Sequence, residues 1–439
     1  MRTTSTASIV LRAGLAAFAY WGAVMLSYHF GGGFEKEANV WIASGVAIGV
    51  LTLADPARWP IYGAALMLGA LTANFVSGAS WLESLVYALE EVLVAAVIAW
   101  LLRRLIGPLP RLDEARKVLL FVAVGALGSA LLGLAAGILA YAVLGLANPL
   151  PEWRLWIISS GVGTLIVAPL MFAWADFRAK RSGGATTADF VLGASLFVLL
   201  IGTTLLVFEG VTAQRFSGSV GYALTYLPLP FLVLGSLVWG ARGATLSTFV
   251  LAAIAVLYTV RGEGPFAGIE GFLGEDVLEV QGYVATAALL TLLLTALSAS
   301  RDRARNAAAE WKLRYEAVIA ASDQLLYELD PVSGRVLWAG DTGRLLGAAP
   351  ASLATLAAYL ERVHPDDRER LRGAFQALQS GGEKMRTTAH RYISASGEEQ
   401  QFDGEANVII DFDDSVHRIV GFLRPVRTAA NLAGPGMAR

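Results

Sequence analysis

Long apolar runs fill the chain from residue 9 to residue 299, and most of them are long enough to cross a lipid bilayer. A spanning helix needs roughly 20 mostly apolar residues, because lipid offers no partner to an exposed backbone group. This criterion predicts a multi-span α-helical membrane bundle of about 8–10 helices, in which the second and ninth candidates are short. The ten candidates are residues 9–28, 39–54, 59–77, 81–102, 117–146, 154–174, 189–209, 220–240, 243–260 and 277–299.

Beyond residue 301 the pattern becomes that of a soluble domain with short elements. Alternation of apolar and polar residues predicts a strand hairpin at 324–339, closed by the turn Asp330-Pro-Val-Ser-Gly334. Helices are then predicted at 342–346, 352–362 and 364–379, and strands at 385–393, 400–411 and 416–426. The order β-β-α-α-α-β-β-β indicates a C-terminal α+β domain with an antiparallel sheet.

The two regions are joined by a segment without glycine or proline. Its apolar seam follows a heptad spacing, which is typical of a parallel helix pair. The seam positions are Leu294, Leu297, Arg301, Ala304, Ala308, Trp311, Tyr315 and Val318. We favour a homodimer through the 294–318 helix and the soluble domain, and the alternative is a single amphipathic helix packed on the soluble domain. The predicted division is 1–300 membrane domain, 301–318 connecting helix, 319–427 soluble domain and 428–439 disordered tail.

Composition removes several classes of function. Only 16% of the residues are charged, against about 25% in soluble proteins, and the net charge of −2 comes with no basic, aromatic-rich stripe. Nucleic acid is therefore not an expected partner. The chain has no cysteine and four scattered histidines, which excludes disulfides and thiolate sites and gives no metal-ligand spacing. The sequence requires no metal and no cofactor.

The distribution of basic residues predicts how the chain is oriented in the membrane. Lys and Arg gather in the loops after the fourth, sixth and eighth spans and after the last one, for example at Arg103, Arg104, Lys180, Arg242 and Arg303. Loops rich in Lys and Arg stay in the cytoplasm. If the number of spans is even, all of these loops lie on the same side of the membrane. Both termini are therefore predicted to be cytoplasmic, with an uncleaved first helix.

Several polar side chains interrupt the apolar spans. Glu90 and Glu91 lie together near the middle of the fourth span, and Glu83 lies seven residues before Glu90 on the same helical face. A charge at this depth costs about 2.5–3.5 kcal/mol, so such groups face the bundle interior. With Asn74 and Trp41 they form a candidate ligand or proton site. The alternative is that these groups only hold the helices together by hydrogen bonds.

Short phrases in the membrane region carry a family resemblance. They are Val40-Trp-Ile-Ala-Ser-Gly-Val-Ala-Ile-Gly-Val50, Arg58-Trp-Pro-Ile-Tyr-Gly-Ala64, Gly69-Ala-Leu-Thr-Ala-Asn74, Gly161-Val-Gly-Thr-Leu-Ile-Val-Ala-Pro-Leu170 and Gly264-Pro-Phe266. In order and spacing they resemble the bacterial membrane-associated sensor domain of the first MASE class, over about residues 10–300. Ile42 and Ala43 stand where that family often has prolines. The resemblance implies an input module in the bacterial inner membrane and leaves its stimulus undefined.

The soluble domain resembles a PAS domain over about residues 315–427. The resemblance rests on the element order and on Arg344-Leu-Leu-Gly347, His364-Pro-Asp-Asp367 and Arg418-Ile-Val-Gly-Phe422. It implies a domain that binds a small ligand or cofactor in the cup of its sheet, or that acts only in dimerisation and relay. Tyr327, Trp338, Phe375 and Phe422 are expected to line this cup. For the His-Pro-Asp-Asp phrase we expect a structural role, with a carboxylate capping the following helix.

Signalling catalysts are missing from the sequence. It contains no phosphoacceptor helix with an ATP-binding domain and no Gly-Gly-Asp/Glu-Glu-Phe loop. The leading expectation is a sensor that is not an enzyme and acts through a separate output protein. One alternative is a truncated sensor kinase or diguanylate cyclase. Another is a PAS-regulated transporter that uses Glu90 and Glu91.

Overall fold

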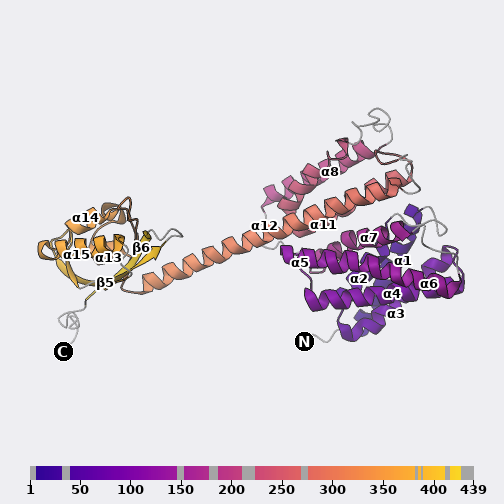
Figure 1. Ribbon diagram of the computed structural model, residues 1–439, viewed down its shortest axis with the longest axis horizontal. Helices are drawn as coiled ribbons and strands as arrows, with labels where there is room; N and C mark the ends of the chain where they lie inside the picture. Colours follow the sequence, from indigo (N-terminus) through magenta and orange to yellow (C-terminus); the bar gives the residue numbers. More distant parts are fainter. Residues whose placement is uncertain are drawn as a thin grey trace. The chain divides into compact units, whose positions relative to one another are not determined.

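The computed structural model describes two compact units within one chain. The units are Met1–Arg303 and Ala304–Arg439, and their boundary falls inside one long helix (Figure 1). The described residues are 6–31, 40–145, 153–176, 186–209, 223–267, 275–380, 384–386, 389–410 and 416–426. The predicted tail at 428–439 lies outside them.

Helices make up the described part of the first unit. They are α1 (Thr6–Gly31), α2 (Ile42–Leu53), η1 (Pro56–Arg58), α3 (Trp59–Val76), α4 (Trp81–Leu105), α5 (Ala115–Leu120), η2 (Phe121–Leu127), α6 (Gly128–Leu144), α7 (Trp153–Trp174), α8 (Thr187–Phe208), α11 (Leu229–Val260) and α12 (Glu275–Ala321). Seven helical stretches among the described residues are long and apolar enough to span a membrane, and residues 42–53 and 158–174 form shorter apolar helices. The prediction of a multi-span helical bundle is confirmed.

Helix α11 contains two of the predicted spans. Its backbone leaves the helical region at Gly240, where φ is 63° and ψ is −156°. That left-handed φ favours glycine, since it carries no Cβ. Leu229 at the start of α11 and Phe266 beyond its end line the same cleft, so the two halves fold back on each other. Although α11 is bounded as one helix, its two halves correspond to the eighth and the ninth predicted spans.

Glycines let α2 and α7 approach closely. A Cβ at Gly163 of α7 would lie 2.0 Å from the backbone oxygen of Trp41, and one at Gly45 of α2 would lie 2.6 Å from the oxygen of Gly163. Gly49, one turn after Gly45, packs on Met171 in the same way. Small residues at such spacing are the usual route to close helix contacts in membranes. This contact fixes the start of α2 inside the bundle.

The second unit contains one antiparallel sheet and short helices. Its strands are β1 (Leu325–Leu329), β2 (Val336–Ala339), β3 (Lys384–Arg386), β4 (His390–Ile393), β5 (Glu399–Ile410) and β6 (Val416–Pro425). The order is β2-β1-β6-β5, with β3 and β4 both pairing with β5. The helices are α13 (Thr342–Leu346), η3 (Pro350–Leu353), α14 (Leu356–Glu361) and α15 (Pro365–Gln379). The predicted antiparallel sheet is confirmed, but the single strand predicted at 385–393 is two strands, β3 and β4.

Alternation along the central strands decides which residues enter the core of this unit. Leu325, Tyr327 and Leu329 are buried on β1, and Ile419 and Leu423 are buried on β6. Successive side chains of a strand point to opposite faces, so the residues between them lie on the other face of the sheet. The buried face is the one on which α15 packs through its apolar side.

Candidate functional site

Trp41, immediately before α2, is the centre of a polar network in the membrane unit. Its Nε1 donates a hydrogen bond to Oε1 of Glu91 on α4, and its backbone N–H donates to the carbonyl of Ser159 on α7 at 3.1 Å. Its ring meets Tyr28 of α1 edge to face, with centroids 5.3 Å apart. Tyr28 in turn donates to Oδ1 of Asn74 at 2.9 Å. We call Tyr28, Trp41, Asn74, Glu91 and Ser159 the Trp41 network.

Three of the five predicted membrane site residues therefore come together. Asn74, Trp41 and Glu91 belong to separate elements. Trp41 bonds Glu91 directly, and Tyr28, which the sequence did not single out, connects Trp41 with Asn74. Glu90 is half-buried. It lies in the same helical turn as Glu91, but its side chain points about 100° away from that of Glu91 around the helix axis. The five elements of the network meet at the start of α2, where the N–H of Ile42 donates to the hydroxyl of Ser27 at 3.0 Å.

Glu83 has a different position. It lies in the first turn of α4, where its carboxylate accepts a hydrogen bond from the backbone N–H of Ser80 at 2.8 Å. The Ser80 hydroxyl accepts in return from the N–H of Glu83, which completes a capping box. The structure therefore does not bring Glu83 into the Trp41 network. Ser80-Trp-Leu-Glu83 fits the capping pattern by sequence alone, so the signal for this role was present.

Helix α4 binds both ends of α2. The Trp41–Glu91 hydrogen bond holds the start, and Arg103 holds the end by donating to the carbonyls of Thr52 at 2.6 Å and Ala54 at 2.9 Å. These carbonyls are left without helical partners at a C-terminus, and a guanidinium also suits the negative end of the helix dipole. Glu91 precedes Arg103 along α4, just as the start of α2 precedes its end, and the two separations are alike. The two helices therefore run in the same direction, and α4 is bonded to both ends of α2.

The segment after α4 binds the last helix. Arg303 of α12 donates to the backbone oxygen of Asp113 and, at 3.3 Å, to Oε1 of Glu114, and the Ser300 hydroxyl donates to the Asp113 oxygen at 3.2 Å. Lys117 pairs with both carboxylates, at 2.9 Å and 2.8 Å. The hydrogen bonds from Lys117 and Arg303 hold the pKa of the Glu114 carboxyl below its usual range. We call Asp113, Glu114, Lys117, Ser300 and Arg303 the α12 clasp.

The second unit has a small internal cavity on the helix-covered side of its sheet. Tyr327, Trp338 and Phe375, three of the four residues expected in a cup on the sheet, line this cavity. Phe422 does not, because strand alternation places its neighbour Leu423 at the cavity and Phe422 on the opposite face. The cavity has a volume of about 10 Å³, which is room for about one water molecule. A cofactor of flavin size would require several core side chains to move.

His390 lines the same cavity and was not predicted to do so. It is 1% exposed, and its Nε2 lies 2.7 Å from the hydroxyl of Tyr359. Burial lowers the pKa of His390 to about 4, so the ring is neutral at physiological pH. Its Nδ1 and the hydroxyl of Tyr327 have no hydrogen-bond partner among the described residues.

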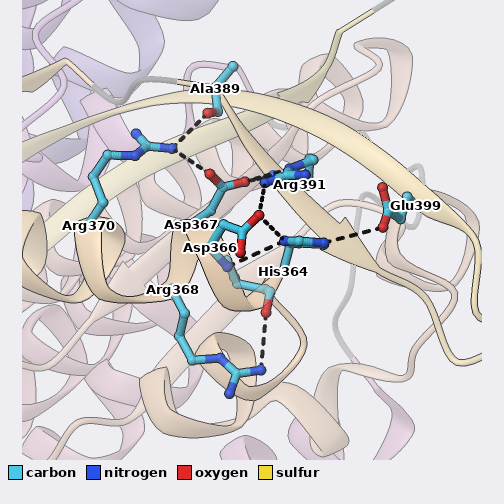
Figure 2. Close-up of polar contacts among 9 residues, drawn as sticks. His364, Asp366, Asp367, Arg368, Arg370, Ala389, Arg391 and Glu399 are labelled. Carbon is cyan, nitrogen blue, oxygen red and sulfur yellow. Dashed lines mark hydrogen bonds and ion pairs between the residues drawn. The ribbon is translucent and has the colours of Figure 1, made fainter.

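A charged cluster on this unit surrounds the start of α15 (Figure 2). His364 is the N-cap residue, and its Nδ1 accepts a weak hydrogen bond from the N–H of Asp366 at 3.4 Å. The expected structural role is present, but the imidazole and not a carboxylate forms the cap. Asp367 instead accepts from the backbone N–H and the Nε of Arg391 on β4, both at 3.0 Å. Among the described residues, no group of His, Asp or Glu side chains is arranged to hold a metal ion.

The ion pair of Asp367 predicts that the stability of the second unit around β4 depends on pH. Its hydrogen bonds with Arg391 hold the pKa of the carboxyl well below its usual range, and its side chain is 15% exposed. A depressed folded-state pKa adds stability above the unfolded value of about 3.9 and loses it as the pH falls below that value. We expect Asp367→Asn to reduce hydrogen-exchange protection of β4 in the full chain at pH 7 by about 1.5–3 kcal/mol. The difference from wild type should shrink below about pH 4.

Asp366→Asn is the matched control for this measurement. Asp366 also pairs with Arg391, but its side chain is 73% exposed. Exposed pairs contribute about 0–1 kcal/mol, so this variant should stay close to wild type. Equal losses of protection in the two variants would contradict a special role for Asp367.

The comparisons with known proteins agree with this architecture. Residues 10–302 match the MASE1 family, and residues 335–423 match the PAS fold. The first match covers well over half of the chain. The molecule is thus a multi-pass membrane sensor module followed by a PAS domain, and no catalytic domain is found in the chain. The chain belongs to the MASE1 family.

Solved structures similar to this chain include sensory domains from several organisms. The N-terminal domain of a diguanylate cyclase with a PAS/PAC sensor from Marinobacter aquaeolei is 17% identical, with a TM-score of 0.22, over 23% of this chain and 94% of that one. A sensory box histidine kinase/response regulator from Burkholderia thailandensis is 19% identical, with a TM-score of 0.23, over 26% and 84%. No curated protein matches the chain. The PAS assignment rests on the family match and the strand order.

Proposed function

We propose that this protein is a sensor of the bacterial inner membrane with both termini in the cytoplasm. The membrane unit would receive the stimulus, and the PAS domain would relay it to a separate output protein without catalysis by this chain. The observation that carries the proposal is helix α12, which continues from Glu275 to Ala321, shortly before strand β1. No glycine or proline interrupts α12 after Gly282. A continuous helix transmits a shift or a rotation that a flexible linker would absorb.

The Trp41 network is the proposed input, and its connections to α12 support this role. Glu91 lies on α4, which also binds the end of α2 through Arg103. The segment that follows α4 ends in Asp113 and Glu114, which hold Arg303 of α12. A change in the hydrogen bonding of Glu91 would therefore reach α12 through one helix and one short segment. Coupling of this kind requires packed elements with two arrangements.

The output end of α12 supports a dimer. Trp311, Tyr315 and Val318 lie at helical spacing and are 71%, 45% and 68% exposed in the single chain. With Ala304 and Ala308 they form a stripe that a second copy of α12 would bury. A stripe of this kind on a helix is typical of a coiled-coil seam, which supports the proposed dimer.

Trp311→Glu should disrupt this dimer. We expect its dimer dissociation constant to rise by at least about thirtyfold, the effect of losing a central aromatic contact of about 2 kcal/mol. Sedimentation of the full chain in detergent micelles measures this change. Leu313→Glu is the control, because Leu313 is equally exposed at 67% but lies off the stripe. Equal weakening by the two variants would contradict the seam.

Recovery of an output partner tests the proposed function as a whole. Tagged full-length protein is captured from solubilised membranes of its own host, and the bound proteins are identified. We expect a signalling protein, such as a kinase, a cyclase or a response regulator, and a weaker recovery with Trp311→Glu than with Leu313→Glu. If no signalling protein is recovered and deletion of the gene alters no output pathway, the proposal is wrong.

A further inference from the structure

The fifth predicted span is one continuous helix from Ala115 to Leu144, and its middle turn is wider than an α-helical turn. Segment η2, at Phe121–Leu127, is a π-helix between α5 and α6. At its end the N–H of Gly128 donates to the carbonyl of Ala123, five residues earlier. A π turn holds one residue more than an α turn, is rare, and occurs frequently at functional sites. We call Phe121–Leu127 the wide turn.

Packing fits the wide turn to its neighbours. The ring of Phe121 lies so close over Gly125 that an added Cβ at this glycine would be 2.8 Å from it. Phe121 is fully buried and meets Phe172 of α7 edge to face, with centroids 6.0 Å apart. An added Cβ at Gly128 would lie 3.0 Å from the side chain of Ile98 on α4. The wide turn therefore contacts α4 and α7, the two helices that bond Trp41.

Three hydroxyl groups connect Trp41 with the end of the wide turn. Ser44 on α2 donates to the carbonyl of Trp41 at 2.9 Å, and Thr164 on α7 donates to the Ser44 oxygen at 3.2 Å. Ser129, in the first turn of α6, lies 3.2 Å from the Thr164 hydroxyl and donates to the carbonyl of Ala126 at 2.9 Å. We call Ser44, Thr164 and Ser129 the hydroxyl chain.

The hydroxyl chain has two arrangements of its protons, because each hydroxyl has a single proton to donate. The proton of Thr164 goes to Ser44. Ser129 then donates either to Thr164 or to the carbonyl of Ala126, which belongs to the wide turn. A displacement of Trp41 moves the carbonyl to which Ser44 donates and changes the balance between these two arrangements. The state of the Trp41 network thus bears on the hydrogen bonding of the wide turn.

The other side of the wide turn leads to the α12 clasp. Lys117 of the clasp lies on α5, four residues before the turn begins. It pairs with Asp113 and Glu114, and these two residues hold Arg303 of α12. Lys117 and Ser129 therefore lie on opposite sides of the wide turn within one helix. Their relative rotation about the helix axis depends on where the additional residue is accommodated.

We propose that the wide turn is a register switch between the Trp41 network and the α12 clasp. When a π turn moves along a helix, each residue that it passes turns by about 100° around the axis and advances by about 1.5 Å. Movement toward Ala115 carries Lys117 away from Asp113 and Glu114 and loosens their hold on Arg303. This inference rests on the proposed function, because it supplies the element with two arrangements that a relay from Trp41 to α12 requires.

Single-residue deletions test whether the wide turn holds one residue in excess. Ala123 is an exposed residue of the wide turn, and Leu131 is an exposed residue of α6. Deletion of Ala123 should restore α-helical bonding without turning either flank, so the detergent-solubilised full chain should unfold near the wild-type temperature. Deletion of Leu131 should turn one flank by about 100° and lower that temperature strongly or prevent folding. Equal damage by the two deletions would overturn the proposal.

Hydrogen exchange of the full chain tests the relay itself. Trp41→Phe removes the donor to Glu91 and keeps an aromatic ring in its place. We expect this substitution to change the protection of the amides at 115–120 by at least about fivefold, the low end of a typical coupling between sites. After deletion of Ala123 the same substitution should leave these amides unchanged, because the helix then has one register only.

Ser129→Ala interrupts the hydroxyl chain at constant helix length, and it should block the effect of Trp41→Phe as the deletion does. Ser195→Ala, which removes an exposed hydroxyl from α8, is the matched control and should leave the effect in place. The proposal is wrong if Trp41→Phe leaves the amides at 115–120 unchanged, or if its effect persists after either interruption. Both results leave the sensor role to the partner-recovery experiment, which tests it separately.

Discussion

Replacing Gly163 by alanine lowers the free energy of unfolding of the membrane unit by about 1–3 kcal/mol, the usual cost of inserting a methyl group into a filled space. The added Cβ would lie 2.0 Å from the oxygen and 2.5 Å from the carbon of the Trp41 carbonyl. Both are backbone atoms, so no side-chain rotation relieves the overlap. The start of α2 must move, and the hydrogen bond from Trp41 to Glu91 weakens with it. Thermal unfolding of the detergent-solubilised chain measures the loss.

Gly202→Ala on α8 is the matched control for this substitution. An added Cβ there meets no atom within 4 Å. Alanine is intrinsically a better helix former than glycine by about 0.8–1.0 kcal/mol, so this variant should be neutral or slightly more stable. The same methyl group thus has opposite expected effects at the two sites. Equal effects would mean that the α2–α7 contact does not limit the stability of the bundle.

The second large effect is expected at Glu91. Glu91→Gln keeps an oxygen that can accept from Trp41 Nε1, but it cannot carry a charge. We expect this variant to fold as the wild type does and to hold the output of the pathway at one level, whatever the stimulus. Glu91→Ala removes the acceptor as well and leaves the half-buried indole N–H of Trp41 unpaired, at a cost of about 1–3 kcal/mol. It should therefore lose both stability and response.

Glu83→Gln separates the network from general effects of charge removal on α4. Glu83 lies on the same helix, and its carboxylate serves the capping box with Ser80. A glutamine oxygen can accept the same hydrogen bond, so the response should stay normal. The measurement is the output of the recovered partner in cells that carry each variant. A normal response in Glu91→Gln would remove this residue from the input and leave hydrogen bonding between helices as its role.

The apolar pattern was sufficient to predict the helices and their order, because a membrane span is a property of one continuous segment. The ten predicted segments all have helical counterparts among the described residues, including the two halves of α11. The short length predicted for the second span is real, since α2 has 12 residues. Its entrance at Trp41 is held by Ser159 and Glu91, in a sequence that lacks the prolines usual in the family.

Contacts between distant segments could not be predicted in this way. Trp41 and Glu91 are 50 positions apart, and Arg303 and Asp113 are 190 apart. Either partner alone is compatible with many arrangements of the helices. Phe422 shows a second limit, because alternation along β6 gives two faces and only the packing of α15 decides which one is buried. Tyr327 and Trp338, which line the cavity, lie opposite each other on paired strands.

The unbroken course of α12 sets a rule for building chimaeras from this protein. Each residue inserted between Ala304 and Val318 would turn everything downstream by about 100° around the helix axis. Seven inserted residues bring the register back to within about 20°, whereas three or four rotate the seam by up to about 60°. A foreign output domain fused after α12 should therefore respond to the membrane unit only at particular linker lengths. Activity should therefore be highest with no insertion or about seven inserted residues, and lowest with about two or five, which turn the seam by about 140–160°.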